Sequence, residues 1–383
     1  MNRLLLGVLL IGAVGRAPLT SVGPLVSEIR ADLGLSSAAA GLLTTLPLLA
    51  FAVFSLVAPL VAGRAGLERS LAIALLLLAG GIAVRSLPAQ LWTGTIAVGA
   101  AIACFNVLLP SVVKRDFPDR VAPVTGGYSA TQSVVAAVAS GTAVPLAAAA
   151  GGWRWALASW ALLVVVAVAV WAPSVREAGP GANGAARAPL PWRSGLAWQV
   201  TLFMGLQSLA FYVLITWLPT IERDHGIDPA VAGWHLFAYL AAAVAANLLV
   251  PLFMRAGAAQ ADQRLVGLGC AVCIGAGVAG QQWLPWNAWW ALASVLVAGF
   301  GAGMAIVVCL SLFSLRTTDA RQAAALSAMA QSTGYGLAAG GPVLIGALRD
   351  AAGSWTVPVV VLCALTLAMA VVAWLSGRPG TVA

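Results

Sequence analysis

Long apolar stretches alternate with short polar connections along the whole chain. Twelve such stretches, each of roughly 20 to 29 residues, are long enough to cross a bilayer as α-helices. They fall at 4–27, 38–62, 68–87, 91–113, 121–149, 154–173, 197–221, 229–254, 264–284, 287–315, 322–348 and 354–376. The pattern predicts an all-α membrane protein with twelve transmembrane helices.

A Gly-, Pro- and Arg-rich segment, residues 174–196, separates two sets of six stretches and predicts a cytoplasmic linker. Short matches relate the two sets at offsets near half the chain. They are GLSSAAAG (34–41) with GIDPAVAG (226–233), ATQS (130–133) with MAQS (329–332), and AAGGW (149–153) with AAGSW (351–355). Three matches in the same order indicate a duplication. Two six-helix halves, 1–173 and 197–383, predict the major facilitator fold, with a site at the midplane between the halves.

Composition and charge support the membrane assignment. Hydrophobic residues make up 61% and charged residues 8% of the 383 residues, whereas a soluble domain has about a quarter charged residues. Fourteen of the twenty basic residues fall in the connections on the side of the two termini. The positive-inside rule therefore predicts cytoplasmic N- and C-termini in a multi-pass protein of the inner (plasma) membrane. This distribution explains the net charge of +8 without a nucleic-acid partner.

Arg16 is a cation in the middle of the first apolar stretch, LLIGAVGRAPLTSVGPLV (9–26). Burial of a guanidinium in a span costs several kcal/mol, so such a residue indicates function. Its planar fork of donors suits a small planar anion such as cyanate or a carboxylate. The alternative is a structural arginine that binds carbonyls freed by Pro18 or Pro24, or one that extends toward water. Thr20 lies one turn later on the same face and adds a hydroxyl donor, unless it bonds its own backbone.

The acidic residues exclude other functions. All twelve are predicted in connections or at the ends of spans, which argues against a transporter of organic cations. The spans contain no carboxylate pair, metal-ligand cluster or nucleophile–base set, and the chain has no nucleotide-binding loop. The sequence thus predicts neither an enzyme nor a protein with a cofactor or metal.

Further polar residues lie deep in spans that line the central cavity in this architecture. They occur at helical spacings that place each pair on one face, where they line the substrate route or form hydrogen bonds between helices. The residues are Asn106, Tyr128, Gln132, Gln207, Tyr212, Gln331 and Tyr335.

His235 titrates near neutrality and is a candidate for proton coupling, with a hydrogen-bonded structural histidine as the alternative. Glu28 and Glu222 end equivalent helices of the two halves. They are candidates for gating or proton coupling, or else solvated charges at helix ends. Arg64 and Arg69, in GRAGLERS (63–70), lie where a cytoplasmic gate motif is expected, with membrane anchoring as the alternative.

Several stretches resemble the cyanate/nitroimidazole permease (CynX/NimT) family of the major facilitator superfamily. They are NVLLPSVVKRDFPDRV (106–121), LTSVGPLVSEIRADLGLS (19–36), AGLLTTLPLLAF (40–51) and WQVTLFMGLQSLAFYVLITWLP (198–219). One departure lies beside Arg16: Val14 and Ala17 stand where the family has asparagine and proline.

The resemblance implies a permease for small polar or anionic solutes. We expect a secondary active transporter of a small anion or weak acid such as cyanate, with Arg16 as the counter-ion of the substrate. The alternative is efflux of small neutral aromatic compounds such as 2-nitroimidazole. The expected partners are the small-molecule substrate, the lipid bilayer and, as an open alternative, a coupling proton. Twelve spans in one chain are sufficient for a functional monomer.

Overall fold

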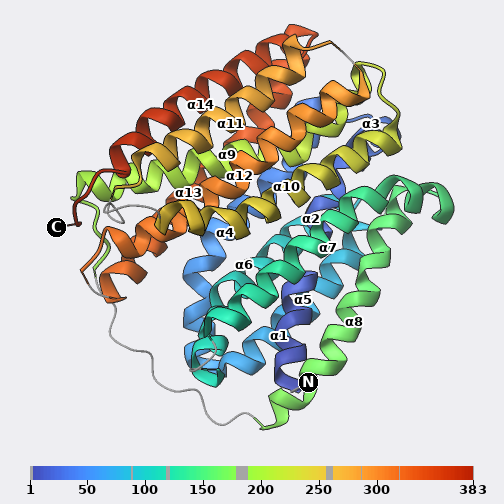
Figure 1. Cartoon of the computed structure of the whole chain (residues 1–383). Helices are drawn as coiled ribbons and strands as arrows, with labels where there is room; N and C mark the ends of the chain where they lie inside the picture. Colours follow the sequence, from blue (N-terminus) through green and yellow to red (C-terminus); the bar gives the residue numbers. More distant parts are fainter. Residues whose placement is uncertain are drawn as a thin grey trace. The chain divides into compact units, whose positions relative to one another are not determined.

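The computed structural model describes residues 3–87, 89–117, 121–177, 189–255, 262–285, 287–318 and 320–382. Helices account for nearly all of these residues, and no strand occurs among them (Figure 1). The helices are α1 (Arg3–Val14), α2 (Ala17–Thr20), α3 (Val22–Leu33), α4 (Ser37–Ala65), α5 (Leu67–Arg85), α6 (Leu91–Asp116), α7 (Val121–Ala150), α8 (Trp153–Glu177), α9 (Gly195–Asp224), α10 (Pro229–Arg255), α11 (Arg264–Trp283), α12 (Ala288–Leu315), α13 (Ala320–Ala352) and α14 (Thr356–Ser376).

The helices confirm the all-α membrane architecture predicted from the apolar stretches. In the described part of the chain, eleven helical segments are long and apolar enough to cross a membrane. The twelfth predicted span, 322–348, lies within α13, a helix of 33 residues that is not one of these eleven. The length of each apolar stretch follows from bilayer thickness, so hydropathy places these helices well.

The first predicted span, 4–27, is wrong in one respect: it is not a continuous helix. The chain leaves helical geometry at Gly15 and Arg16, where Arg16 has φ −132° and ψ −35°. The Gly15 N–H closes a tight turn onto the Gly12 carbonyl at 3.1 Å. Pro18 has no N–H to donate to the Val14 carbonyl, so the α-helical ladder cannot run through this point. The span is therefore built from α1, α2 and α3.

The chain divides into two compact units, residues 1–29 with 46–185 and residues 30–45 with 186–383. In the first unit α1 packs against α7 and α8, and α5 packs against α6 and α8. Gly7 lets α1 approach Trp171 of α8, since a Cβ there would lie 2.7 Å from the indole ring. The Trp171 Nε1–H donates to the Glu68 carbonyl at 3.0 Å. These contacts join α1, α5 and α8 in one bundle.

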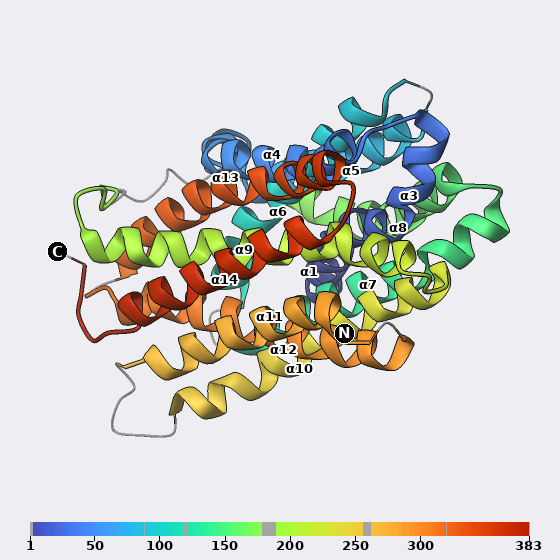
Figure 2. The ribbon, with the colours of Figure 1, turned by 90° about the horizontal axis from the view of Figure 1, so that it is seen from above.

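The second unit is organised around α9, which packs against α13 and α14 (Figure 2). Helix α12 packs against α10 and α11. Glycines make this close packing possible: a Cβ on Gly303 of α12 would overlap the backbone of Ala243 in α10. Most of α9 is buried, including its ionisable residues Tyr212 and Glu222.

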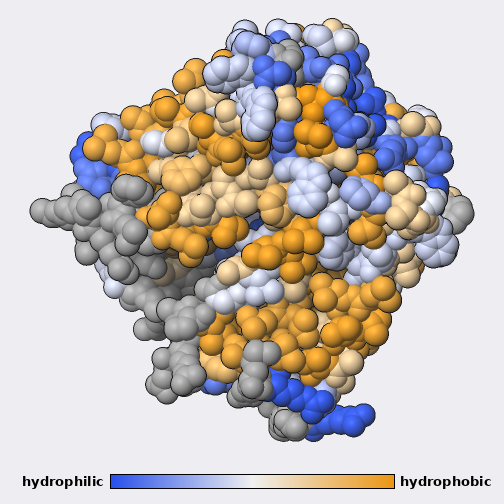
Figure 3. Space-filling view, turned by 45° about the vertical axis from the view of Figure 1, so that its right-hand side comes forward, coloured by the Kyte–Doolittle hydropathy of each residue, from blue (hydrophilic) through white to orange (hydrophobic). Residues whose placement is uncertain are grey.

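Hydrophobic side chains also cover much of the surface. Figure 3 shows broad hydrophobic areas on one face, with hydrophilic residues gathered toward the top and bottom of the view. Leu162, Leu248, Leu265 and Leu367 each expose more than 70% of their area. Large exposed apolar areas of this kind are unstable in water but suit contact with lipid chains. The surface thus agrees with a multi-pass membrane protein.

Candidate functional site

A pocket of about 120 Å³ lies within the first unit. This is the space of about four water molecules at roughly 30 Å³ each, enough for a molecule of a few heavy atoms. The pocket is formed by α1, α6 and α7, and its lining residues are Ile11, Gly12, Phe105, Asn106, Leu109, Tyr128, Ser129 and Gln132.

The pocket brings together three of the residues predicted from the sequence: Asn106, Tyr128 and Gln132. Ser129 was missed, because a serine next to a tyrosine gave no separate signal. Amide and hydroxyl groups line one part of the pocket, and Ile11, Phe105 and Leu109 line the rest. None of the eight described lining residues is acidic. The chemistry therefore suits a small anion or a neutral polar molecule better than a cation.

Glycines bring α1 close to α7 at this pocket. A Cβ on Gly12 would lie 2.8 Å from the Tyr128 carbonyl oxygen, and one on Gly15 would lie 3.0 Å from the Gln132 amide nitrogen. Both distances are too short for a larger residue without a shift of the neighbours. Arg16 follows Gly15 directly and is half-buried. The interruption of the first span thus lies beside the Gln132 end of the pocket.

Arg85 supports the interrupted segment from α5. This arginine falls near the end of the predicted span 68–87; it is the last residue of α5 and only 2% exposed. Its Nη1 donates to the Pro18 carbonyl of α2 at 2.7 Å. Its Nε and Nη2 are buried and have no hydrogen-bond partner among the described residues. Its position near the end of an apolar stretch does not indicate that Arg85 binds the Pro18 carbonyl.

Thr20 is buried at the end of α2, with 1% of its area exposed. Its hydroxyl lies 2.9 Å from the Ala136 carbonyl of α7 and 3.3 Å from the Arg16 carbonyl. The hydroxyl proton can serve only one of these acceptors, and the shorter contact is to α7. Thr20 therefore ties α2 to the helix that carries Tyr128 and Gln132.

In the second unit the predicted polar residues occupy two separate places. Gln207 is 4% exposed, and its amide nitrogen donates to the Ser208 hydroxyl at 2.7 Å and lies 3.3 Å from the Met204 sulfur. Gln331 of α13 donates to the Ser327 hydroxyl at 2.8 Å. Both amides have partners on their own helix.

Tyr212 and Tyr335 lie in an aromatic cluster. Their rings are 6.4 Å apart with an edge-on geometry, and Phe211 lies 5.2 Å from Tyr212 and 6.1 Å from Tyr239. Such pairs stabilise packing, and they also offer flat apolar surface to an aromatic ligand. The two tyrosines come from α9 and α13, so the sequence could not show that they meet.

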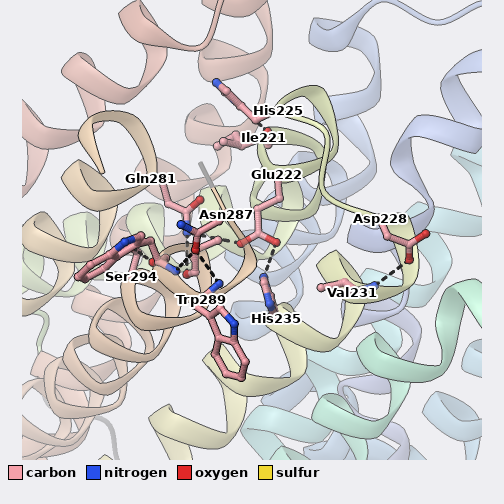
Figure 4. A network of polar contacts seen from close by, with 12 residues as sticks. Ile221, Glu222, His225, Asp228, Val231, His235, Gln281, Asn287, Trp289 and Ser294 are labelled. Carbon is pink, nitrogen blue, oxygen red and sulfur yellow. Dashed lines mark hydrogen bonds and ion pairs between the residues drawn. The ribbon is translucent and has the colours of Figure 1, made fainter. Parts of the chain in front are cut away.

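Glu222 and His235 form a buried pair (Figure 4). The His235 Nδ1 lies 2.8 Å from the Glu222 Oε2, and the two side chains are 7% and 0% exposed. The Gln281 amide nitrogen lies 3.5 Å from the Glu222 Oε1 and 3.2 Å from the Ala291 carbonyl oxygen. One alternative for Glu222, a solvated charge at a helix end, is wrong: the residue is 0% exposed, and His235 of α10 and Gln281 of α11 contact it. Gln281 was not predicted.

The remaining candidates lie apart from these clusters. Glu28 is half-buried near the end of α3. Arg64 and Arg69 are exposed. Between them in sequence, Glu68 is 8% exposed and forms an ion pair with Arg115 at the end of α6.

Arg115 also contacts Asp116 at 2.7 Å. Hydrogen bonding to Asp116, and then to Glu68, raises the pKa of the Arg115 guanidinium above its ordinary value. The cation at this place therefore remains charged. Contact between the connection 63–70 and α6 is thus made by Glu68, whereas the two predicted arginines face solvent. Among the described residues, no group of three or more His, Cys, Asp or Glu side chains could hold a metal ion.

Comparison with known proteins places this arrangement in a family. Residues 5–279 and 200–382 match the Major Facilitator Superfamily. The chain is 44% identical to the 2-nitroimidazole transporter of Escherichia coli (strain K12), over 98% of this chain and 96% of that protein. It is 31% identical to the cyanate transport protein CynX of the same organism, over 92% and 91%.

Solved structures agree on the fold. The nucleoside transporter NupG (D323A mutant) superposes with a TM-score of 0.79 at 12% identity, covering 97% of this chain and 99% of that chain. The resemblance read from NVLLPSVVKRDFPDRV and the other stretches is thereby confirmed, as is the multi-pass localisation in the inner (plasma) membrane. The protein is a transporter of the Major Facilitator Superfamily and belongs to its cyanate/nitroimidazole permease family.

Proposed function

We propose that the protein is a secondary active transporter that carries a small anion or weak acid, such as cyanate, by alternating access. The observation that carries this proposal is the position of Arg16 at the interruption of the first span, next to Gly15 and the Gln132 end of the pocket. The guanidinium supplies the positive charge for the anion, and Asn106, Tyr128 and Gln132 supply hydrogen bonds. A small planar anion matches the planar donor fork of arginine.

The interruption itself favours a functional role for Arg16. A helix that loses hydrogen bonds inside a membrane is tolerated where the backbone lines a cavity or is buried in protein. Here Pro18 breaks the ladder, Arg85 binds the Pro18 carbonyl and Thr20 binds α7. Two separate residues therefore hold the broken segment in place. Such support for an interrupted segment is expected where its position matters for a ligand.

A second candidate is efflux of a small neutral aromatic compound such as 2-nitroimidazole. The 44% identity to a 2-nitroimidazole transporter and the ring cluster of Phe211, Tyr212, Tyr239 and Tyr335 favour it. In that case the rings of Tyr212 and Tyr335 provide the stacking surface. Gln207 and Gln331 then give up their hydrogen bonds to Ser208 and Ser327 and form hydrogen bonds with the ligand instead.

Binding measurements on purified protein separate the two candidates. Under the anion proposal, Arg16→Ala weakens cyanate binding at least about tenfold, equivalent to about 1.4 kcal/mol, and Arg16→Lys restores it only in part because an ammonium lacks the planar fork. Binding of 2-nitroimidazole changes little. Arg176→Ala, which removes an exposed arginine of α8 in the same unit, is the matched control and binds as wild type.

Unchanged cyanate affinity in a correctly folded Arg16→Ala variant contradicts the anion proposal. If wild-type protein binds 2-nitroimidazole, and Tyr212→Ala abolishes that binding while cyanate has no effect, the second candidate is correct. Thermal stability as a function of ligand concentration provides the readout, because a ligand that binds the folded state raises stability by mass action.

A further inference from the structure

The pair of Glu222 and His235 lies in the second unit and is separate from the pocket that contains Asn106 and Gln132. Glu222 comes from the end of α9, and His235 from the second turn of α10. Gln281 near the end of α11 contacts the carboxylate from the other side. Three helices thus enclose one carboxylate whose side chain is 0% exposed. A buried carboxylate in a membrane protein is costly and requires an explanation.

Three titratable groups at the ends of α9 and α13, Asp224, His225 and Asp350, have other partners. Asp224 accepts from the Arg349 Nη2 at 3.1 Å and from the Trp355 Nε1 at 2.9 Å. Asp350 accepts from the backbone N–H groups at the start of α4. The His225 Nδ1 lies 2.7 Å from the Ile221 carbonyl.

Among the described residues of the other helices packed against α9, no Asp, Glu, Lys or Arg forms a hydrogen bond with Glu222. Helices α12 and α14 contain no Asp, Glu, Lys or Arg. Asp228 caps the first turn of α10 through its contacts with Ala230 and Val231. The remaining titratable or charged groups of α9, α10, α11, α12, α13 and α14 are Arg223, Arg255, Arg264, Arg321, the tyrosines 212, 239 and 335, and the cysteines 270, 273, 309 and 363. The imidazole is therefore the ionisable side chain that forms a hydrogen bond with this carboxylate.

The number of protons on the pair sets its charge. When Glu222 is a carboxylate and His235 a neutral imidazole, the pair carries one negative charge. When two protons are added to that state, the pair carries one positive charge. With one added proton it is neutral overall, whichever side chain holds it. Burial disfavours net charge, so the neutral pair is the stable resting form. The 2.8 Å contact accommodates the proton on either side, as Glu–H donating to Nδ1 or as imidazolium Nδ1–H donating to the carboxylate.

Gln281 can satisfy both forms of the carboxyl group. Its amide nitrogen faces Glu222 at 3.5 Å, which suits a carboxylate, while its Oε1 is buried without a hydrogen-bond partner among the described residues. Rotation of the amide by half a turn would present that oxygen to a protonated Glu222, which could then donate to it. A side chain with one donor and one acceptor end thus accompanies the gain and loss of a proton.

We propose that Glu222 and His235 bind the proton that drives transport, one proton for each anion carried. This deepens the function proposed above and rests on it. An anion that crosses alone works against a membrane potential that is negative inside, whereas an anion with a proton moves no net charge. The imidazole retains slight exposure while the carboxylate has none. His235 is therefore the side from which the proton enters and leaves, and Glu222 holds it as a protonated carboxyl group at rest.

Infrared spectroscopy tests the proton site without any substrate. Purified protein in vesicles of phosphatidylethanolamine and phosphatidylglycerol is titrated with acid, and the band of a protonated buried carboxyl group is followed. We expect a band that disappears in Glu222→Gln and whose midpoint pH moves in His235→Asn. Asp228→Asn is the matched control, since asparagine keeps the cap of α10 while one nearby carboxylate is lost. A band that persists unchanged in Glu222→Gln overturns the proposal.

Transport by the same vesicles tests coupling, with radiolabelled cyanate as the probe. Wild-type protein accumulates cyanate when the outside is acid. In Glu222→Gln and His235→Asn this accumulation is lower than in wild type by at least about tenfold. Both variants still exchange internal for external cyanate close to the wild-type rate, because exchange moves no net proton. His235→Asn keeps the test decisive if Glu222→Gln does not fold. Accumulation that responds to the pH gradient as in wild type overturns the proposal.

The two proposals fail differently. If wild-type protein neither binds nor exchanges cyanate, the anion function is wrong, while the infrared band still decides whether Glu222 binds a proton. If cyanate is exchanged normally and no variant alters its coupling, the anion function stands and the proton assignment is wrong.

Discussion

Two apolar spans, 4–27 and 197–221, differ in continuity, although the sequence matches predict that they correspond. In the first half, α1, α2 and α3 are separated at Gly15–Arg16 and at Ser21. In the second, α9 is one helix of 30 residues with Pro219 near its end. At the position of Arg16, α9 has Ser208, which is 3% exposed. The two spans therefore differ in their middle part.

Four residues account for this difference. The first span has Gly15-Arg16-Ala17-Pro18, and the corresponding run of α9 is Gln207-Ser208-Leu209-Ala210. The first contains the two residue types that most weaken a helix, glycine and proline, around a cation. The second contains neither, and its amide and hydroxyl bond each other. Discontinuity thus accompanies the charge: the interrupted span contains Arg16, and the continuous helix has a neutral serine.

The largest effect is expected from moving the arginine to the other half. Ser208→Arg places a guanidinium in a buried site beside Met204 and Gln207. We expect a loss of roughly 5 kcal/mol in the free energy of unfolding, about 3 from the buried charge and about 2 from overpacking. Size-exclusion profiles and thermal unfolding in detergent measure it.

The reciprocal change, Arg16→Ser, is the control for that swap. It keeps the fold and the unfolding temperature close to wild type, because Gly15 and Pro18 still interrupt the helix. If Ser208→Arg is as stable as Arg16→Ser, α9 tolerates a cation in the same way as the first span, and the difference between the halves has no energetic basis.

The second effect concerns Arg85, which holds the interrupted segment through the Pro18 carbonyl. Arg85→Ala removes that bond and leaves a cavity at a fully buried position, so we expect a loss of about 3 kcal/mol in the free energy of unfolding. Arg69→Ala, an exposed arginine on the same helix, should cost no more than about 0.5 kcal/mol. Denaturation monitored by tryptophan fluorescence compares the two.

Equal stability of these two variants would show that burial of the unpaired Nε and Nη2 of Arg85 destabilises the fold by as much free energy as its hydrogen bond to Pro18 stabilises it. In that case the segment is held by α7 alone, and support from α5 is not part of the difference between the halves.

The sequence predicted the helices well because their length is set by the bilayer and their apolar character is local. It predicted seven polar residues deep in spans for a similar reason, since an amide or phenol inside a span must face protein or a cavity, and three of them, Asn106, Tyr128 and Gln132, line the pocket. Neither inference needs knowledge of which helices touch. The interruption at Arg16 was missed because apolar periodicity does not record hydrogen bonds.

Residues whose role depends on contact between distant helices could not be predicted. Glu222 and His235 are 13 residues apart and lie near the ends of different helices, so each alone looked solvated or structural. Gln281 is 59 residues from Glu222. Arg85 lies near the end of the predicted span 68–87, and its position in the sequence does not show that it contacts Pro18. In each case packing brings a polar group into the interior, and a one-dimensional pattern contains no measure of packing.

The smallest effect compares two threonines that are equally buried, each 1% exposed. The Thr20 hydroxyl donates across helices to Ala136, whereas the Thr201 hydroxyl of α9 donates to Ala197 one turn back on its own helix. Thr20→Val should cost about 1 kcal/mol in the free energy of unfolding, and Thr201→Val less than about 0.5, because a bond to the same helix contributes little. Chemical denaturation of the two variants, measured side by side, resolves this difference. Equal losses would mean that the contact with α7 does not position α2, and that the broken span depends on Arg85 for its support.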